Sequence, residues 1–524
     1  MLQLLRRGWK EWLHLKERQG ILLSLLLISF STLLALYIPK LAGDFIDKLE
    51  LVDDEGALMT LVVCITLQQV TYGIANLFLN LIAERIALRL RTKTFSALIK
   101  KPQSYFDSTS RQKMLQATLA DIDAIRTVIS YEISQFLERV LTVVGGFVAI
   151  IFVSPLLAFY TALIAPVIAL TLSLAGERIV YPLEVEARGR VVDVSEAADE
   201  SFNNSQIVRS FGMEKAVVNR FQIPAFNRFV ADRKAALGLT IFRGLIYYIA
   251  GMALLAACWY GRIMVRDEKS IQSGDLIAFL VYAVQIAVSL ANSTRGLAVI
   301  NLGVSCANST FQLLDEEDHE YRKESGEFYG NGNGNGNGDS YLSKPCEELR
   351  FDNVVFAYPT PGRNEEVLKG INLTLRRGRS IALVGPSGAG KSSMISLVEK
   401  FYSPTNGRIL VDDVNLEHIS ARAWRNRIGL VTQDACLFNG TIAENIALGM
   451  PDCEVPWQEI QRAAAIAHVT EFSKDLPLGL DTHIGHRGSH LSAGQRQRVA
   501  VARAIIRDPH VLLLGKSLCL ASWR

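Results

Sequence analysis

The chain has 524 residues, which is enough for more than one domain, and 49% of them are hydrophobic. A mean hydropathy of +0.21 is high for a soluble protein, and the apolar residues concentrate before residue 305. The formal net charge is only +3, and the Lys and Arg residues are spread along loops, which argues against a nucleic-acid partner. Seven scattered cysteines without C-x-x-C spacing argue against a disulfide framework or a zinc site.

Six hydrophobic stretches predict membrane-spanning helices, because about 20 apolar residues match the thickness of a bilayer. The second stretch carries Gln68, Gln69 and Asn76, and the sixth carries Gln285, Asn292 and Arg295, of which Arg295 near the inner end of its span can also extend to the membrane surface. Polar groups in a span usually face a bundle interior or a water-filled cavity, so these side chains either contact a substrate or hold helices together. The six stretches are residues 21–38, 57–82, 136–153, 156–176, 241–262 and 275–300.

The distribution of Lys and Arg predicts the orientation, since cytosolic loops carry an excess of them. The basic leader, residues 1–19, and the basic segments 83–135 and 177–240 are expected on the cytosolic side. Trp9 and Trp12 in the leader indicate an elbow helix on the membrane surface, and the remnant of an organellar address is the alternative. In an organelle, the leader and the soluble half would face the matrix or stroma.

The two long polar segments between spans are expected to be helices that continue the spans into the cytosol and return. Few turn residues interrupt them, and both contain opposite charges at helix-neighbour spacing. These pairs are Asp123 with Arg126, Glu184 with Arg188, and Glu186 with Arg190.

A low-complexity run of alternating Gly and Asn, residues 330–338, marks a domain boundary, since such a run behaves as flexible coil. The sixth span is expected to end near Asn301, well before this run. We therefore predict a transmembrane domain with an elbow helix over residues 1–314, a flexible linker over 315–347 and a soluble domain over 348–524.

The soluble half begins with short β-rich runs that lead into a glycine-rich loop. Leu349 to Ala357 and Ser380 to Val384 are expected strands, and Met394 to Phe401 is expected in the helix after the loop. A strand, the pattern G-x-x-x-x-G-K-S and a helix together predict a P-loop that binds a nucleoside triphosphate. The loop residues are Gly385, Pro386, Ser387, Gly388, Ala389, Gly390, Lys391 and Ser392, followed by Ser393.

The chemistry of this loop follows from its residue types. Glycines let backbone N–H groups wrap the phosphates, and the helix N-terminus adds partial positive charge. Lys391 is expected to reach the β- and γ-phosphates, and the hydroxyl of Ser392 is expected to bind Mg²⁺.

Further motifs occur in a fixed order around the P-loop. Tyr358 precedes it, Gln433 follows the expected strand Ile428 to Thr432, and a five-residue signature opens a basic helix, Arg496 to Arg507. The signature is Leu491, Ser492, Ala493, Gly494 and Gln495. With these motifs the chain resembles, over nearly its whole length, the ATP-binding-cassette exporters, in particular half-transporters of the multidrug and antigen-peptide transporter type.

The resemblance implies an α-helical polytopic membrane domain with six spans and long intracellular helices, followed by an α/β P-loop nucleotide-binding domain. Tyr358 would stack on adenine, and Gln433 would sense Mg²⁺ and couple to the membrane domain. Ser492 and Gly494 would contact the γ-phosphate held by a second cassette, with Ala493 in place of the commoner glycine. The implied function is ATP-driven export by alternating access, in a homo- or heterodimer of half-transporters within lipid.

The chain departs from the family after Val511 to Leu514. There the family places an Asp that holds Mg²⁺ through water and a Glu that activates the attacking water, whereas this chain has Gly515 and Lys516. A protonated lysine cannot act as a base, and glycine offers no carboxylate. No catalytic residue is therefore intact, and we predict negligible hydrolysis at this P-loop. The alternative function is a catalytically dead regulatory or dominant-negative splice-form partner.

The cassette is also expected to be truncated, because the later D-loop and switch histidine of the family are absent. The last apolar strand would then have an open edge. Gly515, Lys516 and Ser517 can be encoded GGT-AAG-TCN, and introns commonly begin GTAAGT, so translated intron is our hypothesis for the tail. A frameshift or a truncated clone is the alternative, and sequencing the gene and transcript distinguishes them.

Overall fold

A computed structural model describes residues 15–324 and 345–515, except 50–54, 154, 156–157, 160–177, 180, 264–271, 360–364 and 452. Contacts divide the chain into two compact units, each of which is described by itself. The helical unit is Met1–Ile99 with Ser110–Asp315, and the α/β unit is Lys100–Thr109 with Glu316–Arg524.

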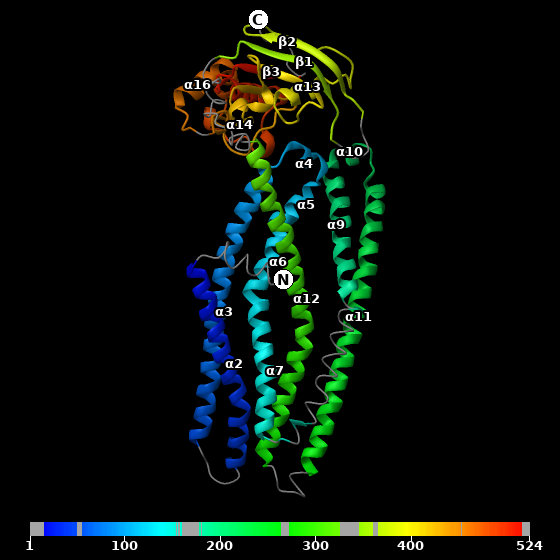
Figure 1. Ribbon diagram of the computed structural model, residues 1–524, viewed down its shortest axis with the longest axis vertical. Coiled ribbons are helices and arrows are strands. Elements are labelled where there is room, and N and C mark those ends of the chain that lie inside the picture. Colours follow the sequence, from blue (N-terminus) through cyan, green and yellow to red (C-terminus); the bar gives the residue numbers. More distant parts are fainter. Residues whose placement is uncertain are drawn as a thin grey trace. The chain divides into compact units, whose positions relative to one another are not determined.

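Four helices that lie wholly or mostly in the helical unit are far longer than the roughly 20 residues that cross a bilayer. Helix α2 has 35 residues, α3 has 45, α11 has 50 and α12 has 52. They are the long blue and green ribbons of Figure 1. Their bounds are Leu15–Leu49 for α2, Glu55–Ile99 for α3, Glu214–Ile263 for α11 and Ser273–Glu324 for α12.

Another long run of the helical unit is continuous but not uniformly α-helical. It contains two π-helical segments, η2 and η3, where the backbone is wound more loosely than in an α-helix. In order it consists of α5 (Arg111–Leu115), η2 (Gln116–Ala120), α6 (Asp121–Thr127), η3 (Val128–Glu132) and α7 (Ile133–Val153).

Five helical segments in the described part of the chain are long and apolar enough to cross a membrane. They correspond to the first, second, third, fifth and sixth predicted spans, and the fourth, residues 156–176, lies largely outside the described residues. The five segments are Lys16–Asp47, Gly56–Ile99, Arg111–Val153, Glu214–Ala256 and Ser273–Leu290.

The polar segments between spans are helical, as predicted. Helix α3 continues to Ile99, and α9 (Tyr181–Asn203) and α10 (Ser205–Ser210) precede α11. Helices α9 and α11 lie side by side (Figure 1). The short helix α4 (Gln103–Ser108) follows α3 but packs within the α/β unit.

The expected charge pairs are only partly found. Asp123 pairs with Arg126 at 3.5 Å, and it also binds Arg91 of α3 at 2.6 Å. Arg190 pairs with Asp193 instead of the expected Glu186, since a residue three positions along a helix is as close a neighbour as one four positions away. The side chains of Glu184 and Arg188 lie outside the described residues.

Glycines bring α2 and α12 into close contact. A β-carbon on Gly274 would lie 2.1 Å from the carbonyl oxygen of Gly43. The N–H of Gly274 donates to the carboxylate of Asp47 at 2.8 Å, which satisfies one of the free donors in the first turn of α12. Buried Phe279 of α12 packs in one apolar cluster with Ile150 of α7.

The α/β unit contains two sheets. The antiparallel sheet has strand order β2-β1-β3-β4, and the second sheet pairs β5 with β6 in parallel. The strands are β1 (Glu348–Phe356), β2 (Leu368–Arg376), β3 (Asn406–Val411), β4 (Val414–Asn415), β5 (Ile428–Val431) and β6 (Val511–Leu514). The helices are α13 (Lys391–Val398), α14 (Ala421–Arg425), α15 (Ile442–Ala447), α16 (Trp457–Ile466), α17 (Val469–Ser473) and α18 (Ala493–Ile505).

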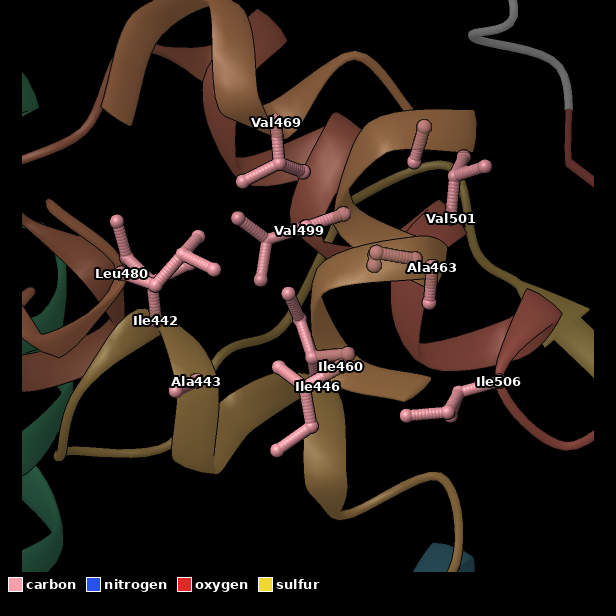
Figure 2. Close-up of a cluster of buried hydrophobic side chains, with 14 of the residues drawn as sticks. Ile442, Ala443, Ile446, Ile460, Ala463, Val469, Leu480, Val499, Val501 and Ile506 are labelled. Atoms are coloured by element: carbon pink, nitrogen blue, oxygen red, sulfur yellow. The ribbon is translucent and has the colours of Figure 1, made fainter. Parts of the chain in front are cut away.

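Two apolar cores hold the α/β unit together. The first lies around the sheets and α13, where fully buried Trp424 donates its indole N–H to the carbonyl of Val398 at 2.7 Å. The second joins α15 to α18, and Figure 2 shows Ile442 and Ile446 of α15 facing Val499 of α18. We call these cores the sheet core and the helical core.

Two sequence predictions for the α/β unit are wrong. Ser380 to Val384 forms no strand and is exposed, with Val384 92% accessible, because the segment has no hydrogen-bonded ladder partner among the described residues. The helix after the P-loop covers Lys391–Val398 instead of reaching Phe401, because Lys400 adopts a left-handed φ of 54° just beyond it. Strands β1, β5 and β6 lie within one residue of their predicted bounds.

Helix α12 does not end near Asn301 but runs to Glu324, into the segment predicted as linker. The Gly/Asn run and the residues 1–14 of the predicted elbow helix lie outside the described residues. The six described cysteines are free thiols, and burial raises the pKa of the Cys346 thiol to about 11.

Candidate nucleotide-binding site

The P-loop adopts a backbone that requires its glycines. Gly388 and Gly390 have φ values of 84° and 81°, in the left-handed region that favours glycine. A β-carbon on Gly390 would lie 2.5 Å from the side chain of Leu368, so glycine also allows β2 to approach the start of α13. Residues 385–389 are exposed, so a ligand can reach the loop.

Lys391 is folded back over this loop. Its Nζ donates to the carbonyl oxygens of Gly385 at 2.8 Å and Pro386 at 2.6 Å. The ammonium group therefore lies inside the loop, where the phosphate of a bound nucleotide would compete with these carbonyls for its protons. Ser392, in the first turn of α13, has an exposed side chain. The donors present fit a bound triphosphate.

Tyr358 lies next to the P-loop helix. Its hydroxyl shares a 2.9 Å hydrogen bond with Oγ of buried Ser393. Its half-buried ring packs edge-on against Phe356 and Tyr402, with centroid distances of 4.8 and 5.2 Å. The structure thus brings the expected adenine-stacking residue and the phosphate-binding loop together.

Gln433 follows β5 and is exposed, and its backbone is tightly packed against Gly515. The N–H of Gly515 donates to the carbonyl of Val431 at 2.8 Å, which extends the β5–β6 pairing. A β-carbon on Gly515 would lie 2.7 Å from the backbone nitrogen of Gln433, closer than real β-carbons come. This position therefore accepts no side chain without a shift of the loop around Gln433.

The family resemblance implies a Mg²⁺ ion at this site, and the residues present fit one only in part. Ser392 and Gln433 offer a hydroxyl and an amide, but the position of the family's Mg²⁺ carboxylate is glycine, packed too closely to carry one. In the described part of the chain no group of three or more His, Cys, Asp or Glu residues is arranged to hold a metal. The residues present fit phosphate binding better than they fit metal binding.

The signature residues begin helix α18. The Ser492 hydroxyl accepts from the N–H of Gln495 at 3.3 Å, and the Gln495 side chain accepts from the N–H of Ser492 at 2.8 Å, which is a capping box. Ser492, Ala493 and Gly494 are exposed, whereas Leu491 is buried in the helical core. The helix begins at Ala493 and ends at Ile505, so the predicted basic helix is displaced by two to three residues.

The two halves of the expected site lie on different cores. The P-loop helix α13 packs on the sheet core through Met394 and Leu397, whereas the signature segment packs on the helical core through Leu491. Phosphate-binding loop and signature are therefore separate features of the α/β unit, each with exposed polar groups.

The sequence analysis did not predict the hydrogen bonds by which Arg503 joins the loop after Gln433 to the signature helix. Arg503 of α18 donates to the carbonyl of Cys436 at 2.9 Å and to the side-chain oxygen of Asn445 at 2.7 Å. Asn445 is 1% exposed and binds both backbone groups of Phe438. Burial lowers the pKa of the Arg503 guanidinium, whose charge these acceptors satisfy. The only signal in the sequence is an arginine within an otherwise apolar stretch of α18.

Membrane-length helices and an α/β unit with a P-loop define a membrane protein with an attached nucleotide-binding domain. Residues 20–290 match the family described as ABC transporter transmembrane region, and residues 368–515 match the family described as ABC transporter. The chain belongs to the ABC transporters, with a transmembrane region followed by the nucleotide-binding domain. The fold class predicted from the sequence is thereby confirmed.

Several characterised transporters are similar to the chain. It is 31% identical over 441 residues to ABC multidrug transporter mdr2 of Aspergillus fumigatus, covering 84% of this chain and 53% of that one. It is 30% identical over 499 residues to ATP-dependent lipid A-core flippase 1 of Colwellia psychrerythraea, covering 90% and 79%. A fatty acid ABC transporter ATP-binding/permease protein of Mycobacterium bovis is 31% identical, covering 84% and 66%.

The chain spans about half the length of some of these relatives, 53% for the Aspergillus protein. A solved structure of a bacterial Atm1-family ABC exporter with ATP bound superimposes with a TM-score of 0.79 at 24% identity, covering 97% of this chain and 86% of that one. At that identity the match establishes a shared fold.

Proposed function

We propose that the chain is one half of a dimeric, ATP-dependent exporter. The observation that carries this proposal is that the P-loop and the exposed signature lie on two separate cores of one α/β unit. In the proposed dimer, each completes a nucleotide site with the opposite half from a second chain, identical or related. The N-terminus of α18 suits this role, because its free N–H groups attract phosphate.

The proposed substrate is amphipathic, peptide-like or lipid-like. Its support is indirect: the relatives are named for multidrug transport, lipid A-core flipping and fatty acid transport. The proposed position of the N-terminus and the nucleotide-binding domain is the cytosolic side, or the matrix or stromal side in an organelle. The basic segments 83–135 and 177–240 support this orientation.

At its own P-loop the chain is proposed to bind ATP without hydrolysing it. The loop glycines and Lys391 hold the triphosphate, and Tyr358 contacts the adenine. Gly515 has no carboxylate and no space for one, and Lys516 cannot accept a proton from water at neutral pH. Mg²⁺, if bound at Ser392 and Gln433, would offset phosphate charge.

The same observation at Gly515 favours a second candidate function, a catalytically inactive regulatory or dominant-negative partner. Such a chain would pair with a hydrolysing subunit and occupy one of the two nucleotide sites. Co-expression with an intact half-transporter distinguishes the candidates. An exporter half supports transport in the pair, whereas an inhibitory partner lowers transport as its share of the pairs increases.

Inter-chain disulfide formation tests the composite site. In a background without the seven cysteines, we would mix chains carrying Ser387→Cys with chains carrying Ser492→Cys and add ATP. The proposal expects a disulfide-linked dimer only in the mixture and only with ATP. Val217→Cys, on α11 of the helical unit, replaces Ser492→Cys as the control and should not cross-link. Absence of the linked dimer from the mixture with ATP would contradict the dimeric site.

A further inference from the structure

Polar and charged side chains of α3 and α7 gather within two of the candidate membrane spans. Glu138 and Arg139 lie in the third predicted span, and Tyr72 and Asn76 lie in the second. Such groups are costly in lipid and are kept where they join helices or bind a ligand. The contacts of the individual side chains separate these two roles.

Asn76 and Arg139 join helices. The side-chain oxygen of Asn76 on α3 accepts from the hydroxyl of Ser134 on α7 at 3.4 Å. Arg139 pairs with Glu132 at 3.9 Å, and these two side chains are only 13% and 10% exposed. A β-carbon on Gly296 would clash with the Arg139 guanidinium, so glycine lets α12 pack directly on this ion pair.

A chain of hydrogen bonds runs from Arg139 to Glu138 in one direction. The Arg139 guanidinium donates to Oε1 of Gln135 at 3.3 Å, which orients that amide. The amide nitrogen of Gln135 then donates to the hydroxyl oxygen of Tyr72. A hydroxyl that accepts still has its own hydrogen to donate, and the Tyr72 hydroxyl hydrogen-bonds to the Glu138 carboxylate. Glu138 is therefore the last acceptor of this chain.

The Glu138 carboxylate has room for a further partner. A carboxylate offers about four lone-pair sites, of which Tyr72 occupies one. In the described part of the chain Glu138 takes part in no ion pair, because the neighbouring Arg139 pairs with Glu132. Its side chain is partly exposed, so a ligand can reach it. The side chain of Arg295 lies outside the described residues.

Two tyrosines accompany this carboxylate. Tyr131, Gln135 and Glu138 are spaced by four and three residues, which places them on one face of the run from η3 to α7. Tyr131 is 53% exposed and lies close enough to Tyr72 to interact with it electrostatically. Aromatic rings attract cations through the negative charge of their faces, and a carboxylate does so more strongly. We call Tyr72, Tyr131, Gln135 and Glu138 the Glu138 cluster.

We propose that the Glu138 cluster binds the positively charged group of a hydrophobic molecule, so that the exported substrate is a cationic amphipathic compound. The carboxylate of Glu138 pairs with the charge, and Tyr72 and Gln135 position that carboxylate. A fatty acid or another anion would be repelled. The inference deepens the proposed export function, on which it rests for the transport step.

Tetraphenylphosphonium and tetraphenylborate test this charge preference, because they are hydrophobic ions of similar shape and opposite charge. Binding of each ion to the full chain in phosphatidylcholine nanodiscs is measured by equilibrium dialysis, with empty nanodiscs as the blank. ATP binding is measured on the same samples. Tetraphenylphosphonium should bind saturably, and tetraphenylborate should neither saturate nor displace it.

Variants of the cluster locate the site. Glu138→Gln removes the charge and keeps the size, and it should weaken tetraphenylphosphonium binding by about tenfold with ATP binding unchanged. Glu138→Asp keeps the charge and should retain most of the affinity, and Tyr72→Phe should have an intermediate effect. The matched control is Glu84→Gln on α3, which removes the carboxylate of an ion pair with Arg126 and should bind as wild type.

Equal tetraphenylphosphonium affinity in Glu138→Gln and wild type would overturn the cation site, and so would tetraphenylborate binding of similar affinity. Cation binding that appears only in Arg295→Gln would also overturn it, because Arg295 would then already neutralise Glu138. A chain that binds ATP but no tetraphenylphosphonium keeps the proposed export function and loses this substrate class. A chain that binds the cation through Glu138 but no ATP keeps the site and overturns ATP-driven export.

Discussion

Gly515 is the residue at which the nucleotide site departs most from its family. Because a β-carbon there would lie 2.7 Å from the Gln433 backbone, even alanine forces the Gln433 loop to shift. We expect Gly515→Ala to lower the free energy of unfolding by about 1–3 kcal/mol. Thermal unfolding of the nucleotide-free chain measures this, with Gly494→Ala as control because its β-carbon would meet nothing within 4 Å.

The same packing makes restoration of the carboxylate ineffective. Gly515→Asp should leave ATP turnover at background, because the new side chain has no room unless the loop at Gln433 moves. In addition, Lys516 still cannot act as the base that activates water. Substantial ATPase activity of this single variant would contradict the packing argument.

Arg503 is a second residue whose role follows from buried contacts. Arg503→Met removes the side-chain donor of the Asn445 backbone carbonyl and one of the two donors of the Asn445 side-chain oxygen, and an unsatisfied buried group costs about 1–3 kcal/mol. Arg498→Met on the same helix removes only exposed contacts, an ion pair with Glu471 and a hydrogen bond to the carbonyl of His468, and should shift the unfolding temperature much less. Equal decreases of the unfolding temperature in the two variants would show that the hydrogen bonds of Arg503 contribute no stability.

At the level of single residues, local motifs were readable from the sequence and long-range contacts were not. The P-loop, the signature and Tyr358 are found from short patterns, because the chemistry that they serve fixes residue types at fixed spacing. The contact of Arg503 with Asn445 joins residues 58 positions apart. No sequence pattern specifies such a pair, because it depends on how α18 packs against α15.

At the level of elements, the contact between α2 and α12 gives a direct test of helix packing. A β-carbon on Gly274 would meet the backbone of Gly43, which cannot rotate away as a flexible side chain would. We expect Gly274→Ala to lower the thermal midpoint of the chain in detergent, with Gly251→Ala of α11, whose β-carbon would meet nothing within 4 Å, as the matched control. Identical midpoints would contradict this close approach.

Elements were predictable where local periodicity decides them. The spans and the helices that continue them follow from hydropathy and charge, and β1, β5 and β6 follow from apolar runs. Ser380 to Val384 has an equally apolar run but no ladder partner, and a strand exists only when its backbone groups are paired. The end of α12 was missed because residues 302–324 are polar and contain neither proline nor a strong helix breaker other than Gly303.

At the level of the whole molecule, the chain combines membrane-length helices with a nucleotide-binding unit whose P-loop and signature pack on different apolar cores. We propose that two chains together form a complete nucleotide site. Because Gly515 has no carboxylate, we further propose that this chain binds ATP in such a pair without hydrolysing it.

The most direct test of this account is ATP binding and ATP turnover measured on the same purified chain in lipid nanodiscs. The account predicts saturable ATP binding that Lys391→Ala abolishes, together with phosphate release no faster than in that variant. Phosphate release well above background in the unmodified chain, abolished by Lys391→Ala, would contradict it.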